Sequence, residues 1–521
     1  METSAQSRRE LDVVDASTEP TLHRSIHLSR RANLLTSPLL RLPTELIHWI
    51  FLQAIEISPD DDRPVSLVLT AICHQLREIG IASPQLWGTI DLTTPPIAEL
   101  FLERCKRNPH TLKLFPTTSK RPSMCPRREI LWEKLGGCTF DALRSITFEG
   151  TTVELAFEVV GIVRRAPNVS NLDLCTAWFP HSQGHRQPFQ ELLHPIGSPM
   201  PDLSTLRLRG IPIDWTSPLL RNLTKLVLVH PILPPEYTSI NVFLTALSNC
   251  PGLEILGLAH TGPEMLADGD TVVQLHRLRE LSLEFRNPSR IGFILSHIVY
   301  PESTKLAVYI PVVDTDPPEI LSRVFPRQNT QTARHLHKST TLTICLGNKP
   351  HFSTDNLFVY FHEPDLCLES WENPLILTRF ACKIVEVVGG DTITSLNIHV
   401  EAREISPPGE VWEILLHRLP RLKCIHYDLT LMEEDYEPLD FFALVFSQPH
   451  EGGPVCPQLQ HLQLPLAVLA YDPSATILKH ALTERDACGR RLKRIGISGD
   501  GVKAADRLAL EWLRGLVDEV W

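Results

Sequence analysis

The stretch Pro201-Asp-Leu-Ser-Thr-Leu-Arg-Leu208 decides the fold of this chain, because its pattern returns along most of the 521 residues. Leu206 and Leu208 alternate with polar residues, as in a strand that buries one of its faces. The proline stops a preceding helix, because its ring cannot follow the helical hydrogen-bond ladder. The stretch therefore predicts a short strand that follows directly on a helical segment.

The same pattern, P-x-L-x-x-L-x-L with Val, Ile or Tyr permitted at apolar places, occurs again at Pro167, Pro251, Pro420 and Pro457. Copies without the proline begin at Leu143, Leu223, Leu278 and Leu492, and a weaker copy covers residues 393–398. Helical patterns precede several copies, at residues 153–165, 240–250 and 411–419. A strand followed by a helix cannot bury its apolar faces alone, so neighbouring units must stack. The pattern predicts an α/β solenoid.

The solenoid is expected to be irregular. From Leu143 to Leu278 the repeats start 20 to 34 residues apart, whereas regular leucine-rich repeats run about 20–29 residues. Insertions are therefore expected at residues 179–199, 312–340 and 348–374, and the pattern fits least between residues 305 and 390. At residues 504–521, Leu508, Leu510, Trp512, Leu513 and Leu516 have helical spacing and predict a capping helix.

The N-terminal part differs in character from the repeats. Residues 1–35 are polar and mixed in charge and are expected to be disordered. A helix over residues 42–52, opened by Pro43, has a broad apolar face. A second helix is predicted over residues 65–81, and Ser83-Pro84 begins an extended segment.

Composition excludes several classes of protein. The chain has 50 Lys+Arg against 61 Asp+Glu, a net charge of −11, which argues against a nucleic-acid partner. It has 43 Pro and only 25 Gly, and much of the Pro excess falls just before the repeat strands. The 12 Cys contain no CxxC pair, and no long apolar stretch indicates a membrane span or a signal peptide. These features favour a cytoplasmic or nuclear location.

Residues 38–92 resemble an F-box domain. The resemblance rests on the opening Leu42-Pro43-x-Glu45-Leu46, the Ile50-Phe51 pair, the run from Ser66 to Arg77 and the closing Ser83-Pro84-x-Leu86-Trp87. The last piece, with Leu102-Glu-Arg104 and Leu112-x-Leu114, is similar to F-box proteins abundant in mushroom-forming fungi, and the rest resembles their degenerate leucine-rich repeats. The fold class expected is α/β: a small all-α F-box at residues 36–92, then an irregular horseshoe-like solenoid at residues 93–521.

F-box proteins are substrate receptors of cullin–RING ubiquitin ligases. The resemblance therefore implies that residues 36–92 dock on the Skp adaptor and through it on a cullin, while the repeats bind a protein substrate. The adaptor contacts that it implies are Leu42, Pro43, Leu46, Ile50, Phe51, Leu69 and Trp87. A segment of about 50 residues buries little apolar surface by itself, so a covering partner would account for the surplus. The alternative for these side chains is the core of the segment itself.

The chain departs from the family pattern in two places. His74-Gln-Leu-Arg-Glu follows Cys73, where the family carries basic residues and a Trp. The repeats also lack the Asn or Cys that ordinarily follows the strand and satisfies backbone groups of the turn; these places hold Ala177, Ile211, Pro231, Thr261 and Arg286. A regular horseshoe is therefore not expected.

The sequence shows no motif for phosphate binding, metalloprotease chemistry or a serine nucleophile. His181, His185 and His194 have spacing compatible with a metal, and Asp60-Asp-Asp62 could hold a cation, but both are better explained as solvated loops. No cofactor, metal or catalytic residue is predicted. The alternatives to a ubiquitin-ligase receptor are a repeat scaffold that never delivers ubiquitin and an enzyme with a site inside residues 305–390.

Overall fold

The computed structural model describes most of the chain, in two compact units. The described residues are 25–57, 64–114, 126–150, 153–176, 200–229, 239–263, 271–311, 317–325, 339–346, 351–362, 382–400, 409–429, 456–465, 472–498 and 511–520, apart from positions 27, 34, 212, 286 and 356. Unit 1 comprises residues 1–178 and 194–203, and unit 2 comprises residues 179–193 and 204–521. The helical N-terminal segment therefore belongs to one compact unit with the first strands.

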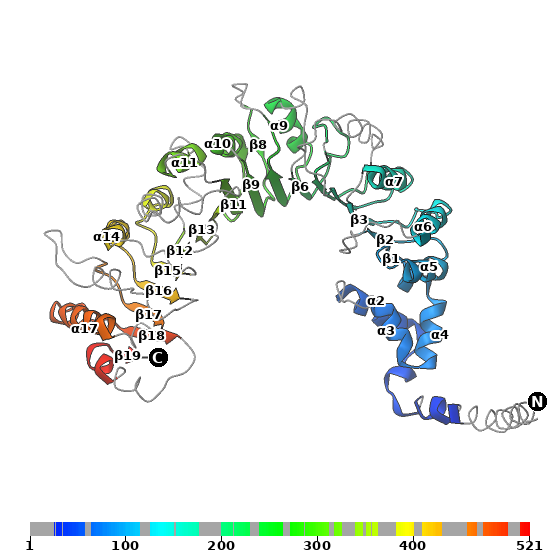
Figure 1. The fold of residues 1–521 in the computed structure, drawn as a ribbon, viewed down its shortest axis with the longest axis horizontal. Coiled ribbons are helices and arrows are strands. Elements are labelled where there is room, and N and C mark those ends of the chain that lie inside the picture. Colours follow the sequence, from blue (N-terminus) through cyan, green and yellow to red (C-terminus); the bar gives the residue numbers. More distant parts are fainter. Residues whose placement is uncertain are drawn as a thin grey trace, which may run out of the picture. The chain divides into compact units, whose positions relative to one another are not determined.

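Unit 1 begins with helices and continues as strand–helix coils (Figure 1). Its elements are η1 Leu39–Arg41, α2 Thr44–Ile57, α3 Val65–Ile72, α4 His74–Ala82, η2 Pro84–Trp87, β1 Thr89–Asp91, α5 Pro95–Arg104, β2 Thr111–Leu114, α6 Pro126–Gly136, β3 Ser145–Gly150, α7 Val153–Arg164 and β4 Asn171–Thr176. The strands β1 to β4 pair in sequence order, each parallel to the next. Parallel neighbours joined by helices are the arrangement that the repeat pattern predicts.

The first helices differ from the sequence prediction in two places. Residues 28–33 are helical, although residues 1–35 were expected to be disordered; residues 1–24 lie outside the described part. The helix predicted over residues 65–81 is broken at Cys73, whose backbone is extended. No Gly or Pro marks this break. The Arg77 Nε donates to the Thr70 carbonyl oxygen at 3.0 Å and so caps the end of α3 from α4.

Unit 2 contains the longer series of strands. Its elements are β5 Thr205–Arg209, β6 Lys225–Val229, α9 Ile240–Ser248, β7 Ile255–Ala259, β8 Val273–Gln274, β9 Glu280–Glu284, α10 Pro288–His297, β10 Ile298–Val299, β11 Lys305–Pro311, α11 Pro317–Val324, β12 Thr341–Leu346, β13 His351–Thr354, β14 Leu357–His362, β15 Ser395–Val400, α14 Gly409–His417, β16 Cys424–Leu429, β17 His461–Pro465, α17 Asp472–Ala487, β18 Arg494–Ser498 and β19 Glu519–Val520. A further helix covers residues 382–388.

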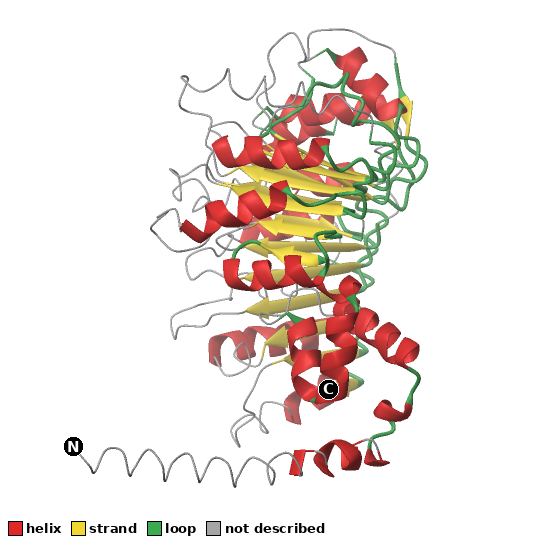
Figure 2. Cartoon of the chain, turned by 90° about the vertical axis from the view of Figure 1, so that its right-hand side faces the viewer, coloured by secondary structure: helices red, strands yellow, loops and turns green. Residues whose placement is uncertain are grey.

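Parallel pairing dominates unit 2 as well. The strands follow the order β5, β6, β7, β9, β11 and β14 in one parallel run and β12, β15, β16, β17, β18 and β19 in another. The helices of unit 2 lie on one side of these strands, which stack as successive layers (Figure 2). Every strand that the repeat pattern predicts is present, and the leucines of the pattern face the helices; Leu206 and Leu208 are 0% and 1% exposed.

The strand order reverses once, in the region where the repeat pattern fits least. β13 pairs antiparallel with both β12 and β14, so β14 rather than β12 lies beside β11. Residues 351–362 therefore belong to the sheet, although residues 348–374 were predicted to be an insertion. Within the second predicted insertion, residues 312–340, α11 packs on α10 like the helix of an ordinary coil. The insertion predicted at residues 179–199 lies outside the described residues.

The chain ends as a strand rather than as a capping helix. Residues 511–516 are helical, with Leu513 fully buried, but β19 then pairs in parallel with β18. Leu508 and Leu510 lie outside the described residues. The last coil thus repeats the helix-then-strand order of the coils before it.

A carbonyl group at the entry of most repeat strands joins successive coils. The Thr224 carbonyl oxygen accepts the N–H groups of Glu254 and Ile255, and the Glu254 carbonyl oxygen accepts those of Arg279 and Glu280. The same double acceptance occurs at Gly88, His110, Arg144, Ser204, Thr340, Thr394, Lys423 and Gln460. Because each coil is held at the same backbone position, the leucines of neighbouring coils stay in register.

Asp355 takes the place of this carbonyl where the strand order reverses. β12 lies beside the antiparallel β13, so no preceding parallel coil faces the start of β12. The Thr340 N–H and hydroxyl both donate to the Asp355 Oδ2, at 2.8 and 2.9 Å, and Thr341 also donates to this carboxylate. Partial burial raises the pKa of Asp355, but these hydrogen bonds outweigh it and bring the pKa below its ordinary value.

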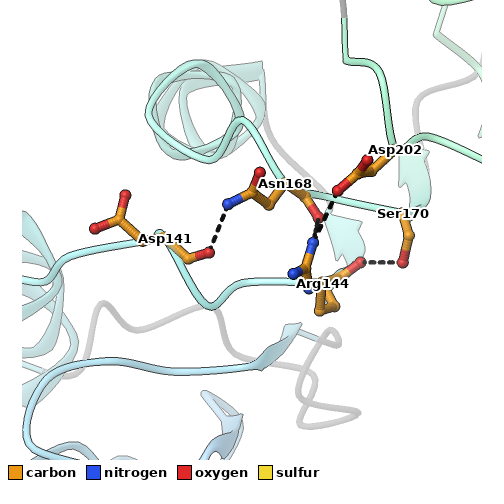
Figure 3. A network of polar contacts seen from close by, with 5 residues as sticks. All are labelled: Asp141, Arg144, Asn168, Ser170 and Asp202. Carbon is orange, nitrogen blue, oxygen red and sulfur yellow. Dashed lines mark hydrogen bonds and ion pairs between the residues drawn. The ribbon is translucent and has the colours of Figure 1, made fainter.

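Side chains supplement the carbonyl ladder in unit 1 (Figure 3). The Arg144 Nη1 donates to the Asn168 carbonyl oxygen at 2.9 Å and to the Asp202 carboxylate at 3.0 Å. The Asn168 Nδ2 donates to the Asp141 carbonyl oxygen, and the Ser170 hydroxyl donates to the Arg144 carbonyl oxygen. The turns before three successive strands are thereby joined without the asparagine that regular repeats use. Of the residues that stand in place of that asparagine, the structure describes Ile211 and Thr261, and both are buried.

We expect Gly292→Ala to destabilise unit 2 by about 1–3 kcal/mol, the usual cost of overpacking a core. A Cβ at Gly292, in α10, would collide with the Arg323 carbonyl oxygen of α11. Gly161→Ala in α7 is the matched control, because no atom of the described residues lies within 4 Å of its Cβ position. There alanine should be neutral or stabilise the helix by up to about 1 kcal/mol. Urea denaturation measures both, and equal midpoints for the two variants would contradict the close approach of α10 and α11.

We expect Asp355→Asn to lower the free energy of unfolding by about 1 kcal/mol at pH 7, because charge-assisted hydrogen bonds to Thr340 and Thr341 weaken. Folding lowers the pKa of Asp355, so its contribution is complete above the unfolded value of about 3.9 and is lost as the pH falls through the folded value. The difference in the free energy of unfolding between wild type and Asp355→Asn should therefore become smaller below about pH 4. Asp391→Asn, at an exposed acid, is the control and should stay within about 0.5 kcal/mol of wild type. A difference in unfolding free energy that does not change with pH would contradict the role of the Asp355 charge.

Candidate interaction surfaces

The helices α2, α3 and α4 carry a concentration of exposed apolar side chains, which we call the helical patch. It consists of Leu42, Leu46, Trp49, Ile57, Val68, Ile72 and Ile81, with exposed fractions from 36% at Leu42 to 77% at Ile57. Beyond residue 81, the only other large apolar side chains exposed in the described part of the chain are Val272 and Ile414. Exposed apolar side chains gathered on neighbouring helices are typical of an interaction site.

One face of α2 packs in the core, and another face lies at the surface. Ile47 and Phe51, one turn apart, are 0% and 1% exposed and pack inward. Leu46 and Trp49 lie on the other side of the helix and are 49% and 60% exposed. A helix needs only one apolar stripe to pack on its neighbours, so the second stripe is not explained by the fold of this segment.

Tight packing holds α3 against α4 and leaves their outer sides free. A Cβ at Gly80 would collide with the Thr70 side chain, so the two helices approach closely at this point. The Thr70 hydroxyl is satisfied locally by the carbonyl oxygens of Ser66 and Leu67. Val68 and Ile72 lie one turn apart on the exposed side of α3, and α3 also packs on α2.

The structure divides the seven predicted contact residues into three groups. Leu42, Pro43 and Leu46 are exposed, Ile50 and Leu69 are half-buried, and Phe51 and Trp87 are buried. The first five remain available to a partner. Phe51 and Trp87 offer no surface, so we place them in the core and not among the contacts.

Trp87 joins the helical segment to the first coil of unit 1. Its indole N–H donates to the Gly80 carbonyl oxygen at 2.7 Å, and its ring meets the Phe101 ring edge-on at 5.0 Å between centroids. The Arg104 guanidinium lies 4.2 Å from the ring centroid. The patch is therefore carried on a segment that is anchored to the repeats.

Sequence reasoning missed Trp49, Ile57, Val68, Ile72 and Ile81. The signal that could have found them is helical spacing. Leu46 and Trp49 are three residues apart, and Val68 and Ile72 are four residues apart. A pattern that is apolar on two sides of a helix does not show which side is covered, and only the packing of α2 on α3 and α4 decides this.

The second candidate surface is the outward face of the strands in unit 2, opposite the leucines. Basic side chains lie on its first strands, at Arg207, Arg209 and Lys225. Half-buried apolar and aromatic side chains follow, at Val227, Ile255, Tyr309 and Phe358. Polar and imidazole groups occupy the next strands, at Asn397, His399, His426 and His461. A surface that changes character along the strands suits a partner with several recognition points.

The described residues show no group of three or more His, Cys, Asp or Glu placed to hold a metal ion. His181, His185, His194 and Asp60–Asp62, the weak metal candidates of the sequence, lie outside the described part. Among the described helices, none has the length and apolar content that a bilayer crossing requires.

Comparison with known proteins adds little. No protein-family model matches the sequence, and neither does any curated protein. Among solved structures, a chain from "Crystal structure of Rad7 and Elc1 complex in yeast" aligns over 94% of this chain and 96% of its own length, with 12% sequence identity and a TM-score of 0.27. A likeness at this level carries no functional argument, so we draw the function from the surfaces of this chain.

Proposed function

We propose that the chain is the substrate-recognition subunit of a Skp–cullin–F-box ubiquitin ligase. In this proposal the helical patch docks the Skp adaptor, the adaptor connects to the cullin, and the outward strand face of unit 2 binds the protein substrate. The observation that carries the proposal is the crowding of exposed apolar side chains on α2, α3 and α4, in the segment that resembles an F-box.

The energetics favour a covering partner. A fully buried aliphatic side chain contributes about 1.5–3 kcal/mol relative to an exposed one. Leu46, Trp49 and Ile72 are each at least 49% exposed, so much of this gain is unused in the free chain. An adaptor that covers the patch would recover it, and the half-buried Ile50 and Leu69 would form the inner edge of the contact.

The mechanism in this proposal is geometric and not chemical. The thioester chemistry of a ubiquitin ligase belongs to a separate conjugating enzyme. This chain would hold a substrate close to that enzyme and so raise the effective concentration of the attacking lysine. Such a role needs two binding surfaces on one chain, and no cofactor or metal.

We expect Leu46→Glu to weaken binding of the purified Skp adaptor at least tenfold, about 1.4 kcal/mol, because a carboxylate then enters an apolar contact. Ile414→Glu is the matched control, since Leu46 and Ile414 are both helical and both 49% exposed. Isothermal titration calorimetry measures the affinities, and circular dichroism checks that both variants are folded.

Two outcomes would contradict the adaptor proposal. One is a wild-type chain that does not bind the adaptor, and the other is equal binding by Leu46→Glu and Ile414→Glu. A non-catalytic repeat scaffold remains the second candidate. It is favoured if the adaptor binds but no partner of the chain is ubiquitinated when the cullin complex is reconstituted.

A further inference from the structure

A cysteine, a histidine and an asparagine form a connected chain of contacts on the outward face of unit 2. The Cys424 Sγ lies 3.2 Å from the His426 Nε2, and the His426 Nδ1 lies 2.9 Å from the Asn397 Oδ1. Asn397 is the direct register partner of His426 on the neighbouring strand. All three side chains are half-buried, so they are ordered by their neighbours and still reach solvent.

The hydrogen bonds determine which imidazole nitrogen is basic. The Asn397 Nδ2 donates to the Thr343 hydroxyl oxygen at 3.2 Å, which turns the amide oxygen toward His426. An amide oxygen only accepts, so the proton of the neutral ring lies on Nδ1. Nε2 therefore carries the free lone pair and faces the Cys424 thiol. This is the arrangement of a nucleophile, a base and a group that orients the base.

The resting pair is neutral. Burial raises the pKa of the Cys424 thiol. Burial, and then the neighbouring His399 and His461, lower the pKa of His426. The other charged groups around it are Asp428, which pairs with His399, and three groups that act on His461: Arg494 and Lys493 lower the pKa of His461 and Glu519 raises it. The thiol therefore donates to a neutral imidazole near pH 7, and the imidazole can take the proton when the sulfur attacks.

The surroundings restrict the electrophile. Acyl transfer needs donors that stabilise an oxyanion beside the sulfur. The nearest side-chain donor, the Ser395 hydroxyl, is hydrogen-bonded to the Cys424 sulfur itself. The Cys424 N–H is already used by the Thr394 carbonyl oxygen, and β16 is paired with strands on both sides. An electrophile whose negative charge develops away from the sulfur, in solvent, does not need such donors. An α,β-unsaturated carbonyl compound has this property.

We propose that Cys424 is a modification site for α,β-unsaturated carbonyl compounds, with His426 as the base and Asn397 as the positioning residue. The Cys424 sulfur forms a bond to the β-carbon while its proton passes to the His426 Nε2. The C=C π electrons shift to form an enolate, which then takes a proton from the imidazolium or from water. The product is a thioether, and no oxidant or further reactant is consumed.

N-ethylmaleimide, a compound of this class, is the probe, used in limiting amount on the full chain with peptide mapping by mass spectrometry. The exposed Cys488 serves as the internal reference. His426→Gln should slow labelling of Cys424 relative to Cys488 at least tenfold, which is less than the roughly 10²–10⁴-fold typical for a general base because a thiol is nucleophilic without one. His276→Gln, at an exposed histidine between β8 and β9, is the control and should change the ratio less than about twofold.

The pH profile separates base assistance from simple exposure. An unassisted thiol loses about tenfold in rate for each pH unit below its pKa, because the thiolate is the reactive form. Because the pKa of His426 lies below its ordinary value of about 6.5, its imidazole is mostly neutral between pH 8 and 7, so labelling of wild-type Cys424 should change much less than tenfold over that interval. In the His426→Gln variant, the labelling rate of Cys424 should fall as the pH is lowered, in parallel with the labelling rate of Cys488.

Buried cysteines report whether a variant is folded. Cys250 and Cys456 are each 1% exposed and should remain unlabelled in a native chain. If His426→Gln exposes them, Asn397→Ala is used instead, because it keeps the base but frees its ring. The proposal is overturned if neither folded variant lowers the ratio of Cys424 to Cys488, or if wild-type Cys424 is not labelled. These measurements need neither adaptor nor substrate, so they are independent of the proposed ligase function.

Discussion

The carbonyl group at the entry of most repeat strands is the contact on which the rest of the structure depends. Where it accepts two N–H groups from the next coil, it sets the next strand beside its neighbour at the same backbone position. The leucines then meet in one buried row and the alternate residues in one outward row. Where the strand order reverses, Asp355 supplies the missing acceptor at the start of β12. The irregular spacing of the repeats is tolerated because the loops and not the strand entries absorb it.

This constraint also creates the outward surface. Residues that are far apart in the sequence, such as Thr343, Asn397 and His426, come into hydrogen-bond distance because three strand entries are aligned. The helical segment follows a different principle, since α2 has two apolar stripes and only one of them is covered. The chain thus combines a polar and aromatic strand face in one unit with an apolar helical patch in the other.

The sequence alone was sufficient for the repeated strands and for the helices that precede them. Period-two leucines and prolines at helix ends are local signals, and they do not depend on which coil is the neighbour. The break at Cys73 and the strands β13 and β14 were missed because their causes are not local. α3 ends where Arg77 of α4 reaches the Thr70 carbonyl, and β14 is a strand because β11 offers it a free edge.

The candidate sites were predictable to different degrees. The apolar character of residues 42–72 can be read from the sequence. Whether each side chain lies at the surface or in the core is decided by packing, which leaves Leu46 exposed and buries Phe51 and Trp87. Cys424 and His426 stand two residues apart, but no sequence pattern marks them as a site, and Asn397 joins them only through strand register. Local periodicity determines which elements form, because each element depends on its own residues. Register and burial determine which residues meet, because they depend on distant segments of the chain.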